Sequence, residues 1–169
     1  MGDLNELRLR YRSDKAALLA DLGVQGSSTR GVRSALQKLS RLTDQTLRAL
    51  WERSGFGPGF ALLAVGGFGR GELFPSSDVD VLVLLPDGAS PETDAALKER
   101  LEGFIGACWD LGLEIGSSVR SIGECVEEAS KDVTVQTSLL ECRLIAVERR
   151  REQELQHLKG LAVIQLHEL

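Results

Sequence analysis

Two short apolar runs in the middle of the chain enclose a segment that is rich in glycine. The first run covers residues 60–65, and the second covers residues 78–85. The first run is bounded by glycines, and the second has polar residues at its start and is closed by Pro86, which is typical of buried strands. Because Gly66 and Gly67 follow the first run directly, the backbone turns there without side chains in the way. The pattern predicts two strands joined by a turn that a ligand can approach closely.

The rest of the chain alternates between helical and strand-like patterns. Apolar residues at helical spacing predict two helices in the first 55 residues, over 4–21 and from Ser28 or Thr29 to residue 54. Further along we expect a helix over 91–109, a strand over 111–119, a short helix opened by a capping box of Ser121 and Glu124, and a helix over 132–146. Together these elements predict an α/β (α+β) fold, a small mixed sheet flanked by helices.

A chain of 169 residues has room for one domain with a helical appendage. We predict an N-terminal helical region over residues 1–55, a central domain over 56–146 and a divergent helical tail over 147–169, which is dense in charge. Trp51 and Trp109 lie on helical stripes and are expected in the core.

Composition excludes several classes of function. A net charge of −5 argues against capture of nucleic acid by bulk charge. No apolar run approaches the roughly 18–20 residues that span a bilayer, so we expect a cytoplasmic protein without a membrane partner. The cysteines, Cys108, Cys125 and Cys142, have no metal-binding spacing and are expected to be buried, reduced thiols. Both histidines lie beyond residue 156, so catalysis in the central domain has to rely on carboxylates.

The start of the second strand carries two carboxylates on the same side. Side chains alternate along a strand, so Asp78 and Asp80 share one small space while Val79 faces the other way. At about 5 Å and an effective dielectric of about 20, two such charges repel by roughly 3 kcal/mol. Protonation or a divalent cation relieves that repulsion, and Mg²⁺ suits oxygen ligands from carboxylates and phosphates.

Two common phosphate-binding loops are excluded by the same segment. Gly66 and Gly71 have the glycine spacing of a P-loop, but Glu72 and Leu73 stand where that loop requires lysine and serine or threonine. The dinucleotide fingerprint fails as well, because Glu72 occupies the place of its third glycine.

What remains is a strand, two glycines, ten residues, and then Asp-Val-Asp on a second strand. This arrangement resembles the signature of the DNA polymerase β-like nucleotidyltransferase superfamily. The segments AVGGFGRGEL (64–73), SDVD (77–80) and GLEIGSSVR (112–120) are similar to the nucleotidyltransferase domain of the bacterial uridylyltransferases that act on the nitrogen-regulatory protein PII. The resemblance covers roughly residues 36–146.

The resemblance implies a polymerase β-like fold and Mg²⁺-dependent transfer of UMP from UTP to PII, with release of pyrophosphate. It places metal binding and catalysis on Asp78 and Asp80, and phosphate binding on Gly66 and Gly67. A third catalytic carboxylate is typical of the superfamily, where it helps to activate the attacking hydroxyl, and Glu114 is placed for that role.

Three of these residues also have structural interpretations. Glu114 either activates the acceptor or pairs with a basic residue such as Arg120. Arg70 either contacts phosphate or forms a surface ion pair. Ser77 either donates to a phosphate or caps the turn before Asp78.

The chain also departs from the uridylyltransferase pattern. Those enzymes carry a His-Asp hydrolase domain that removes UMP, and two histidines in the tail cannot build it, so we expect no uridylyl-removing activity. The alternatives are a truncated module that binds nucleotide or a partner without turnover, and a nucleotidyltransferase that uses ATP or another acceptor.

Overall fold

The computed structural model describes residues 3–24, 28–147 and 156. In chain order the elements are α1 (Leu4–Val24), α2 (Thr29–Ser54), β1 (Ala61–Ala64), α3 (Gly66–Gly69), β2 (Val79–Leu85), α4 (Ala95–Leu111), β3 (Ile115–Ser121), α5 (Ile122–Lys131), α6 (Val133–Leu140) and β4 (Arg143–Val147). None of the described helices is long and apolar enough to cross a membrane.

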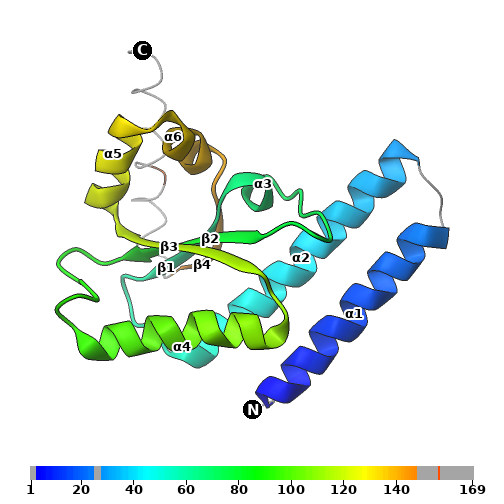
Figure 1. The fold of residues 1–169 in the computed structure, drawn as a ribbon, viewed down its shortest axis with the longest axis horizontal. Coiled ribbons are helices and arrows are strands. Elements are labelled where there is room, and N and C mark those ends of the chain that lie inside the picture. Colours follow the sequence, from blue (N-terminus) through cyan, green and yellow to red (C-terminus); the bar gives the residue numbers. More distant parts are fainter. Residues whose placement is uncertain (1–2, 25–27, 148–155, 157–169) are drawn as a thin grey trace.

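The strands form one mixed sheet in the order β3-β2-β1-β4 (Figure 1). β1 pairs antiparallel with both β2 and β4, whereas β2 and β3 are parallel. Because β2 and β3 are parallel neighbours, both begin at the same end of the sheet, and α4 makes the connection between them. The short helix α3 lies between β1 and β2 in the chain, so the glycine segment reaches that same end of the sheet.

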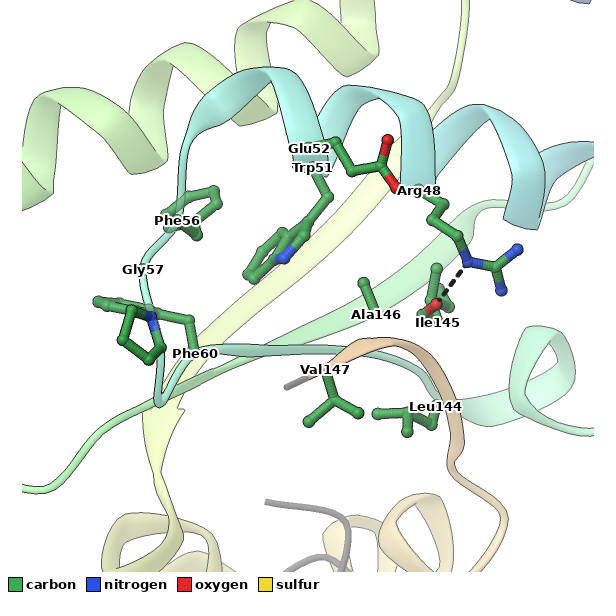
Figure 2. Close-up of a pocket in the computed structure, with 11 residues that line it drawn as sticks. Arg48, Trp51, Glu52, Phe56, Gly57, Phe60, Leu144, Ile145, Ala146 and Val147 are labelled. Atoms are coloured by element: carbon green, nitrogen blue, oxygen red, sulfur yellow. Dashed lines mark hydrogen bonds between the residues drawn. The ribbon is translucent and has the colours of Figure 1, made fainter. Parts of the chain in front are cut away.

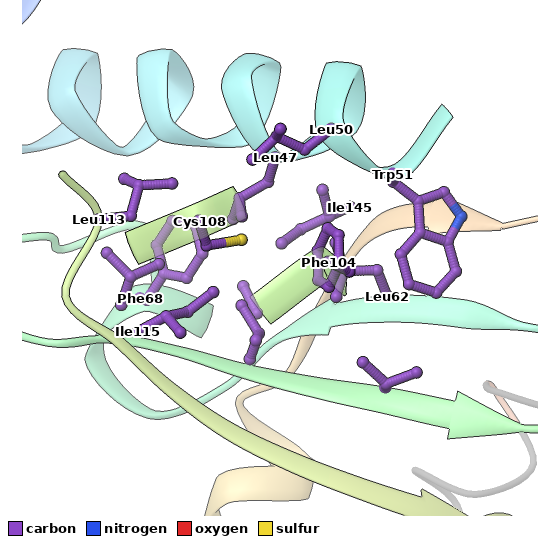
Figure 3. Close-up of a cluster of buried hydrophobic side chains, with 14 of the residues drawn as sticks. Leu47, Leu50, Trp51, Leu62, Phe68, Phe104, Cys108, Leu113, Ile115 and Ile145 are labelled. Atoms are coloured by element: carbon purple, nitrogen blue, oxygen red, sulfur yellow. The ribbon is translucent and has the colours of Figure 1, made fainter. Parts of the chain in front are cut away.

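One face of the sheet packs against α2 and α4, and α1 packs against these two helices. The buried side chains of this face include Phe104 and Cys108 of α4, Leu47 and Leu50 of α2, and alternate residues of the strands (Figure 3). On β2 these are Val79, Val81, Val83 and Leu85. The buried residues of α2 and of α4 lie on one side of each helix. The sheet and these two helices therefore bury each other's apolar surfaces.

The opposite face is covered by α5 and α6, which lie on the other side of the sheet in Figure 1. Its buried cluster is smaller and contains Leu82 and Leu84 of β2 with Cys125 of α5 and Leu139 of α6. All three cysteines are buried thiols outside any disulfide, as predicted. The pKa of the Cys108 thiol is raised to about 12 by burial.

Most of the predicted elements are confirmed. The first two helices, the two central strands and the helix before β3 are present. Ser28 caps α2, where its side chain accepts from the Gly31 N–H, and Gly55 ends the helix at φ 65°. The predicted capping box is also present, with Ser121 and Glu124 bonded reciprocally at the start of α5.

Two predictions about local structure are wrong. The helix expected over 132–146 stops at Leu140, and residues 143–147 form strand β4 beside β1. A short apolar run fits a helix or a strand equally well, and the long-range pairing with β1 decides it. Trp109 is 54% exposed, because it falls outside the stripe of α4 that contacts the sheet. Trp51 is buried, as expected.

The domain boundaries stay predictions. Helix α2 contributes Leu39, Leu47 and Trp51 to the same cluster as the sheet, so the helical region shares the core of the central domain. The predicted tail over 147–169 lies outside the described residues except for Val147, the last residue of β4, and residue 156.

Candidate active site

The glycine segment turns at the end of β1 as the four-residue helix α3. The N–H of Gly69 donates to the carbonyl of Val65 (3.0 Å), and the N–H of Glu72 donates to that of Gly67 (3.0 Å). The first N–H groups of a helix have no partner within the helix, which here applies to those of Gly66, Gly67 and Phe68.

The Asp80 carboxylate lies over two glycines, one from the turn and one from β3. A Cβ on Gly66 would meet Asp80 Oδ2 at 3.5 Å, and Gly66 has φ +58°, where a side chain is strained. A Cβ on Gly116 would collide with Asp80 Oδ1. Asp80 and Gly116 are partners in the parallel register of β2 and β3. The carboxylate is therefore held against the backbone of the turn.

Asp78 and Asp80 are close enough to affect each other's charge. Burial raises the pKa of Asp80 above its ordinary value, and the negative charge of Asp78 raises this pKa further. Both residues are exposed overall, and the Asp80 carboxylate lies against Gly66 and Gly116. The predicted sharing of one space by the two carboxylates agrees with this electrostatic coupling.

Glu114 comes just before β3, whereas the sequence placed it within the strand. Its carbonyl accepts a hydrogen bond of 2.8 Å from the N–H of Val79, and Val79 is the register partner of Ile115. Continuing this register by one residue puts Glu114 beside Asp78. Leu113 and Ile115 point into the core beneath α4, so the exposed Glu114 faces the side of the sheet that carries Asp80.

Ser77 and Arg70 both have intramolecular partners. The hydroxyl of Ser77 donates to the carbonyl of Phe74 (2.9 Å) and so fixes the turn before Asp78. Arg70 Nη1 donates to Glu141 Oε2 at 2.6 Å, and its Nε lies 3.5 Å from Glu72 Oε2. The Arg70 guanidinium also lies near Gly67, where a Cβ would be 3.6 Å from Nη2. It is thus an ion-paired cation at the edge of the glycine turn.

Arg143, which the sequence did not single out, supports the glycine turn from β4. Its guanidinium forms an ion pair with Asp44 of α2 and donates to the carbonyl of Phe68 at 3.0 Å. It also lies over the Phe68 ring, 5.2 Å from the centroid. Three elements are joined in this way, so α3 is fixed on the sheet.

Gly69 and Gly116 were also missed. A Cβ on Gly69 would clash with the carbonyl oxygen of Glu141 and come within 3.0 Å of that of Ala64. Neither glycine has a positive φ among the described residues; the neighbouring backbone or carboxylate demands the absence of a side chain. In the sequence, only the two-residue spacing of Glu114 and Gly116 indicates that Gly116 lies on the same face as a carboxylate.

The residues present suit a hard divalent cation bound together with phosphates. Asp78 and Asp80 offer oxygen atoms alone, which Mg²⁺ prefers, and their mutual repulsion favours a cation between them. Within the described residues no three His, Cys, Asp or Glu side chains come together as a metal cluster. Glu114, although beside Asp78 in the strand register, therefore does not complete a three-carboxylate metal site, and the remaining ligands of such an ion would come from substrate and water.

A cavity of about 640 Å³ lies away from the candidate active site. It is lined by Trp51, Phe56, Phe60 and the residues of β4 from Leu144 onward, and Arg48 Nε donates to the carbonyl of Ile145 across it at 2.9 Å (Figure 2). Phe60 precedes β1 and Val147 pairs with Ala61, so the cavity lies at the end of β1 away from the glycine turn. This cavity contains none of the predicted site residues.

Comparison of the sequence with known proteins matches the chain to a family. Residues 44–145 match the family model described as "Nucleotidyltransferase domain". The chain is 56% identical over 138 residues to the bifunctional uridylyltransferase/uridylyl-removing enzyme of Burkholderia pseudomallei (strain K96243), which covers 82% of this chain and 15% of that enzyme. The enzyme of the same name from Burkholderia vietnamiensis (strain G4 / LMG 22486) is 56% identical over 137 residues, 81% of this chain and 16% of the relative. The chain thus spans about 15% of the length of these curated relatives.

Proposed function

The chain belongs to the nucleotidyltransferase domain family, and we propose that it transfers UMP from UTP to a protein acceptor of the PII type and releases pyrophosphate. The similarity to enzymes named uridylyltransferases supports the choice of nucleotide. The resemblance of the glycine, Asp-x-Asp and Glu114 segments to the PII-modifying enzymes supports the choice of acceptor.

The contact between the Asp80 carboxylate and Gly66 is the observation that carries the proposal. It brings the start of the glycine turn and a carboxylate close together, since a Cβ on Gly66 would lie 3.5 Å from Asp80 Oδ2. Backbone N–H groups at a helix start attract phosphate oxygens, and carboxylates repel them unless a cation lies between. An arrangement of this kind suits a nucleotide that arrives with its metal ion.

Each residue has a distinct task in this proposal. The N–H groups of Gly66 and Gly67 bind phosphate oxygens, and Arg70 adds positive charge at the edge of the turn. Asp78 and Asp80 hold Mg²⁺, which neutralises charge on the phosphates and polarises the α-phosphate when it is bound. Ser77 fixes the turn that leads to Asp78 and is one of the nucleotide-binding residues.

Glu114 accepts the proton in the transfer step. The acceptor hydroxyl gives its proton to the Glu114 carboxylate while its oxygen forms a bond to the α-phosphorus. The bond between the α-phosphorus and the bridging oxygen breaks, and pyrophosphate leaves with that electron pair. Attacking and leaving oxygens lie on opposite sides of the phosphorus, so the acceptor enters on the side away from the pyrophosphate.

Transfer of label from α-labelled UTP to a purified PII-type protein in the presence of Mg²⁺ tests the proposal. We expect labelled acceptor with the wild-type chain and a loss of about a thousandfold, roughly 4 kcal/mol of barrier, in Asp80→Asn. Asp87→Asn is the matched control, because Asp87 is an exposed carboxylate just beyond the far end of β2.

The proposal is wrong if Asp80→Asn transfers label as fast as Asp87→Asn does. Unlabelled ATP in the assay identifies the base preference, since competition by ATP that equals competition by UTP contradicts the assignment of UTP. Pyrophosphate release that PII does not accelerate contradicts the assignment of the acceptor.

A further inference from the structure

Arg143 lies at the start of β4, next to the point where the glycine turn leaves β1. It is the register partner of Ala64, the last residue of β1. Its guanidinium donates to the carbonyl of Phe68 at 3.0 Å and forms an ion pair with Asp44 of α2. A single side chain therefore joins the glycine turn to a helix of the N-terminal region.

The two amino groups of the Arg143 guanidinium serve different partners. Nη1 donates to Asp44 Oδ2, and Nη2 donates to the Phe68 carbonyl. Asp44 Oδ1 is buried and accepts no hydrogen bond from the described residues, so the ion pair is not the bidentate one that arginine and carboxylate commonly form. Because a buried oxygen without a partner costs stability, the use of Nη2 on the turn is a specific feature of this pair.

The glycine turn needs such an external contact. Four of the six residues from 66 to 71 are glycines, and the glycine backbone has the greatest conformational freedom. The Phe68 carbonyl accepts from the N–H of Gly71 at 3.0 Å as well as from Arg143, so both of its lone pairs are engaged. Phe68 is 2% exposed, and the Arg143 guanidinium lies 5.2 Å from the centroid of its ring. The one non-glycine residue in the middle of the turn is thus held at its carbonyl and at its ring.

Arg143 reaches the turn from the face of the sheet opposite to Asp80. The Phe68 ring belongs to the large cluster beneath α2 and α4, together with Val79 and Val81 of β2. Asp80 alternates with these two valines and faces the other side. The guanidinium therefore lies behind the backbone that carries Gly66 and Gly67, and it acts on a ligand at Asp80 only through that backbone.

We propose that Arg143 is a positioning residue for nucleotide binding, an inference that rests on the proposed function. Through the Phe68 carbonyl it keeps Gly66 and Gly67 at the distance from Asp80 that a nucleotide with its metal ion requires. Through Asp44 it makes α2 part of the support of the nucleotide site. Because Asp80 and Glu114 do not depend on this contact for their place on the sheet, loss of Arg143 weakens phosphate binding more than it slows the chemical step.

Replacement of Arg143 by methionine tests the proposal against a matched control, Arg48→Met. Arg48 also joins α2 to β4, where its Nε donates to the Ile145 carbonyl at 2.9 Å, but this contact lies two residues farther along β4. We expect Arg143→Met to raise KM for UTP about tenfold, equal to about 1.4 kcal/mol, and to change kcat less than threefold. Arg48→Met is expected to change both less than twofold. Urea unfolding of both variants establishes the temperature at which each is folded.

Arg143→Lys separates charge from geometry. An ammonium keeps the positive charge but lacks the planar fork that reaches two partners at once, so we expect its KM for UTP to fall between those of wild type and Arg143→Met. If Arg143→Met does not fold, Asp44→Asn carries the test against the same control. It removes the ion pair that orients the guanidinium and is expected to raise KM for UTP several-fold.

Two kinetic results overturn the positioning role. The first is the same KM for UTP in Arg143→Met and Arg48→Met, which would leave Arg143 with a purely structural role. The second is a large fall in kcat with KM for UTP unchanged, which would show that the contact does not act on nucleotide binding.

A binding measurement separates failure of this inference from failure of the proposed function. Inorganic tripolyphosphate with Mg²⁺ is titrated into the full chain by calorimetry, since this probe carries the phosphates of a nucleotide without its base and needs no acceptor. Weaker binding to Arg143→Met than to Arg48→Met supports the positioning role even if the wild-type chain transfers no label to PII. Equal binding to the two variants overturns the positioning role, even if the wild-type chain does transfer label.

Discussion

The two faces of the sheet differ in what they bury. On β2 the residues Val79, Val81, Val83 and Leu85 point into the large cluster beneath α2 and α4. The alternate residues start with Asp80 and continue with Leu82 and Leu84, which belong to the smaller cluster beneath α5 and α6. Strand β2 thus places only apolar side chains on one face of the sheet. On the other face, its first side chain is the Asp80 carboxylate.

This difference separates stability from chemistry. The α2 and α4 side holds the aromatic cluster, in which Phe104 packs edge to face with Trp51 and Phe56. The α5 and α6 side carries the carboxylates and the close approach of backbone around Gly66 and Gly116. A site that concentrates like charges costs stability, and the apolar row on the back of the same strand offsets that cost.

Phe104→Ala gives the largest expected effect. Phe104 is 1% exposed and its ring contacts Trp51 at a centroid distance of 5.5 Å, so truncation leaves a cavity that costs about 3–5 kcal/mol. Urea unfolding measures the loss. At temperatures where the variant is folded we expect UMP transfer near the wild-type rate. A loss of stability below about 1 kcal/mol, or a selective loss of transfer, contradicts the assignment of stability to this face and of chemistry to the other.

Gly116→Ala comes next and acts on the other face. The added methyl group collides with the Asp80 carboxylate, so we expect transfer to fall about 10- to 100-fold, equivalent to about 1.4–2.7 kcal/mol. Gly106→Ala in α4 is the control, because nothing lies within 4 Å of a Cβ there. Helix propensity predicts that this control gains up to about 1 kcal/mol of stability. Equal activity in both variants contradicts the position assigned to Asp80.

The raised pKa of Cys108, on the α2 and α4 side of the sheet, makes the stability of the fold depend on alkaline pH. Its pKa is about 12 in the fold against an ordinary value of 9.0, so above pH 9.0 the unfolded chain releases a proton that the folded chain keeps. Stability therefore falls as pH rises, by about 1.4 kcal/mol from this thiol at about pH 10. The stability advantage of wild type over Cys108→Ala narrows accordingly in urea unfolding between about pH 8 and about pH 10. An unchanged difference contradicts the burial assigned to this thiol.

Thiol labelling of the native protein gives the smallest expected effect. Cys125 and Cys142 belong to the smaller cluster, and Cys108 belongs to the large one. A layer that buries fewer apolar groups opens at lower free energy. We expect an alkylating reagent followed by mass spectrometry to modify Cys125 and Cys142 several-fold faster than Cys108. The reverse order indicates that the α5 and α6 layer is the more stable one.

The parts of the fold that the sequence predicts are those with local signals. The capping box at Ser121, the stripe of α2 and the alternation of Asp78 with Asp80 all lie within one element, where the period of side chains fixes the geometry. The same alternation placed both carboxylates on one side, and their electrostatic coupling agrees with it.

The parts that were missed depend on partners far along the chain. β4 is a strand because β1 lies beside it, and the identity of Gly116 follows from Asp80, which is more than thirty positions away. Arg143 likewise acts on Asp44 and Phe68, neither of which is near it in sequence. Arg70 and Glu141 are also far apart in the sequence. The charge of Arg70 alone therefore does not indicate which residue it pairs with.

The most direct test of the central claim is the thermal stabilisation of the protein by UTP with and without Mg²⁺. Ligand that binds the folded state alone raises the melting temperature, and the rise does not depend on an acceptor. We predict that UTP stabilises the wild-type chain and Asp87→Asn only when Mg²⁺ is present, and that it stabilises Asp80→Asn in neither case. Equal Mg²⁺-dependent stabilisation of Asp80→Asn and wild type would contradict the assignment of the nucleotide to the carboxylate end of the sheet.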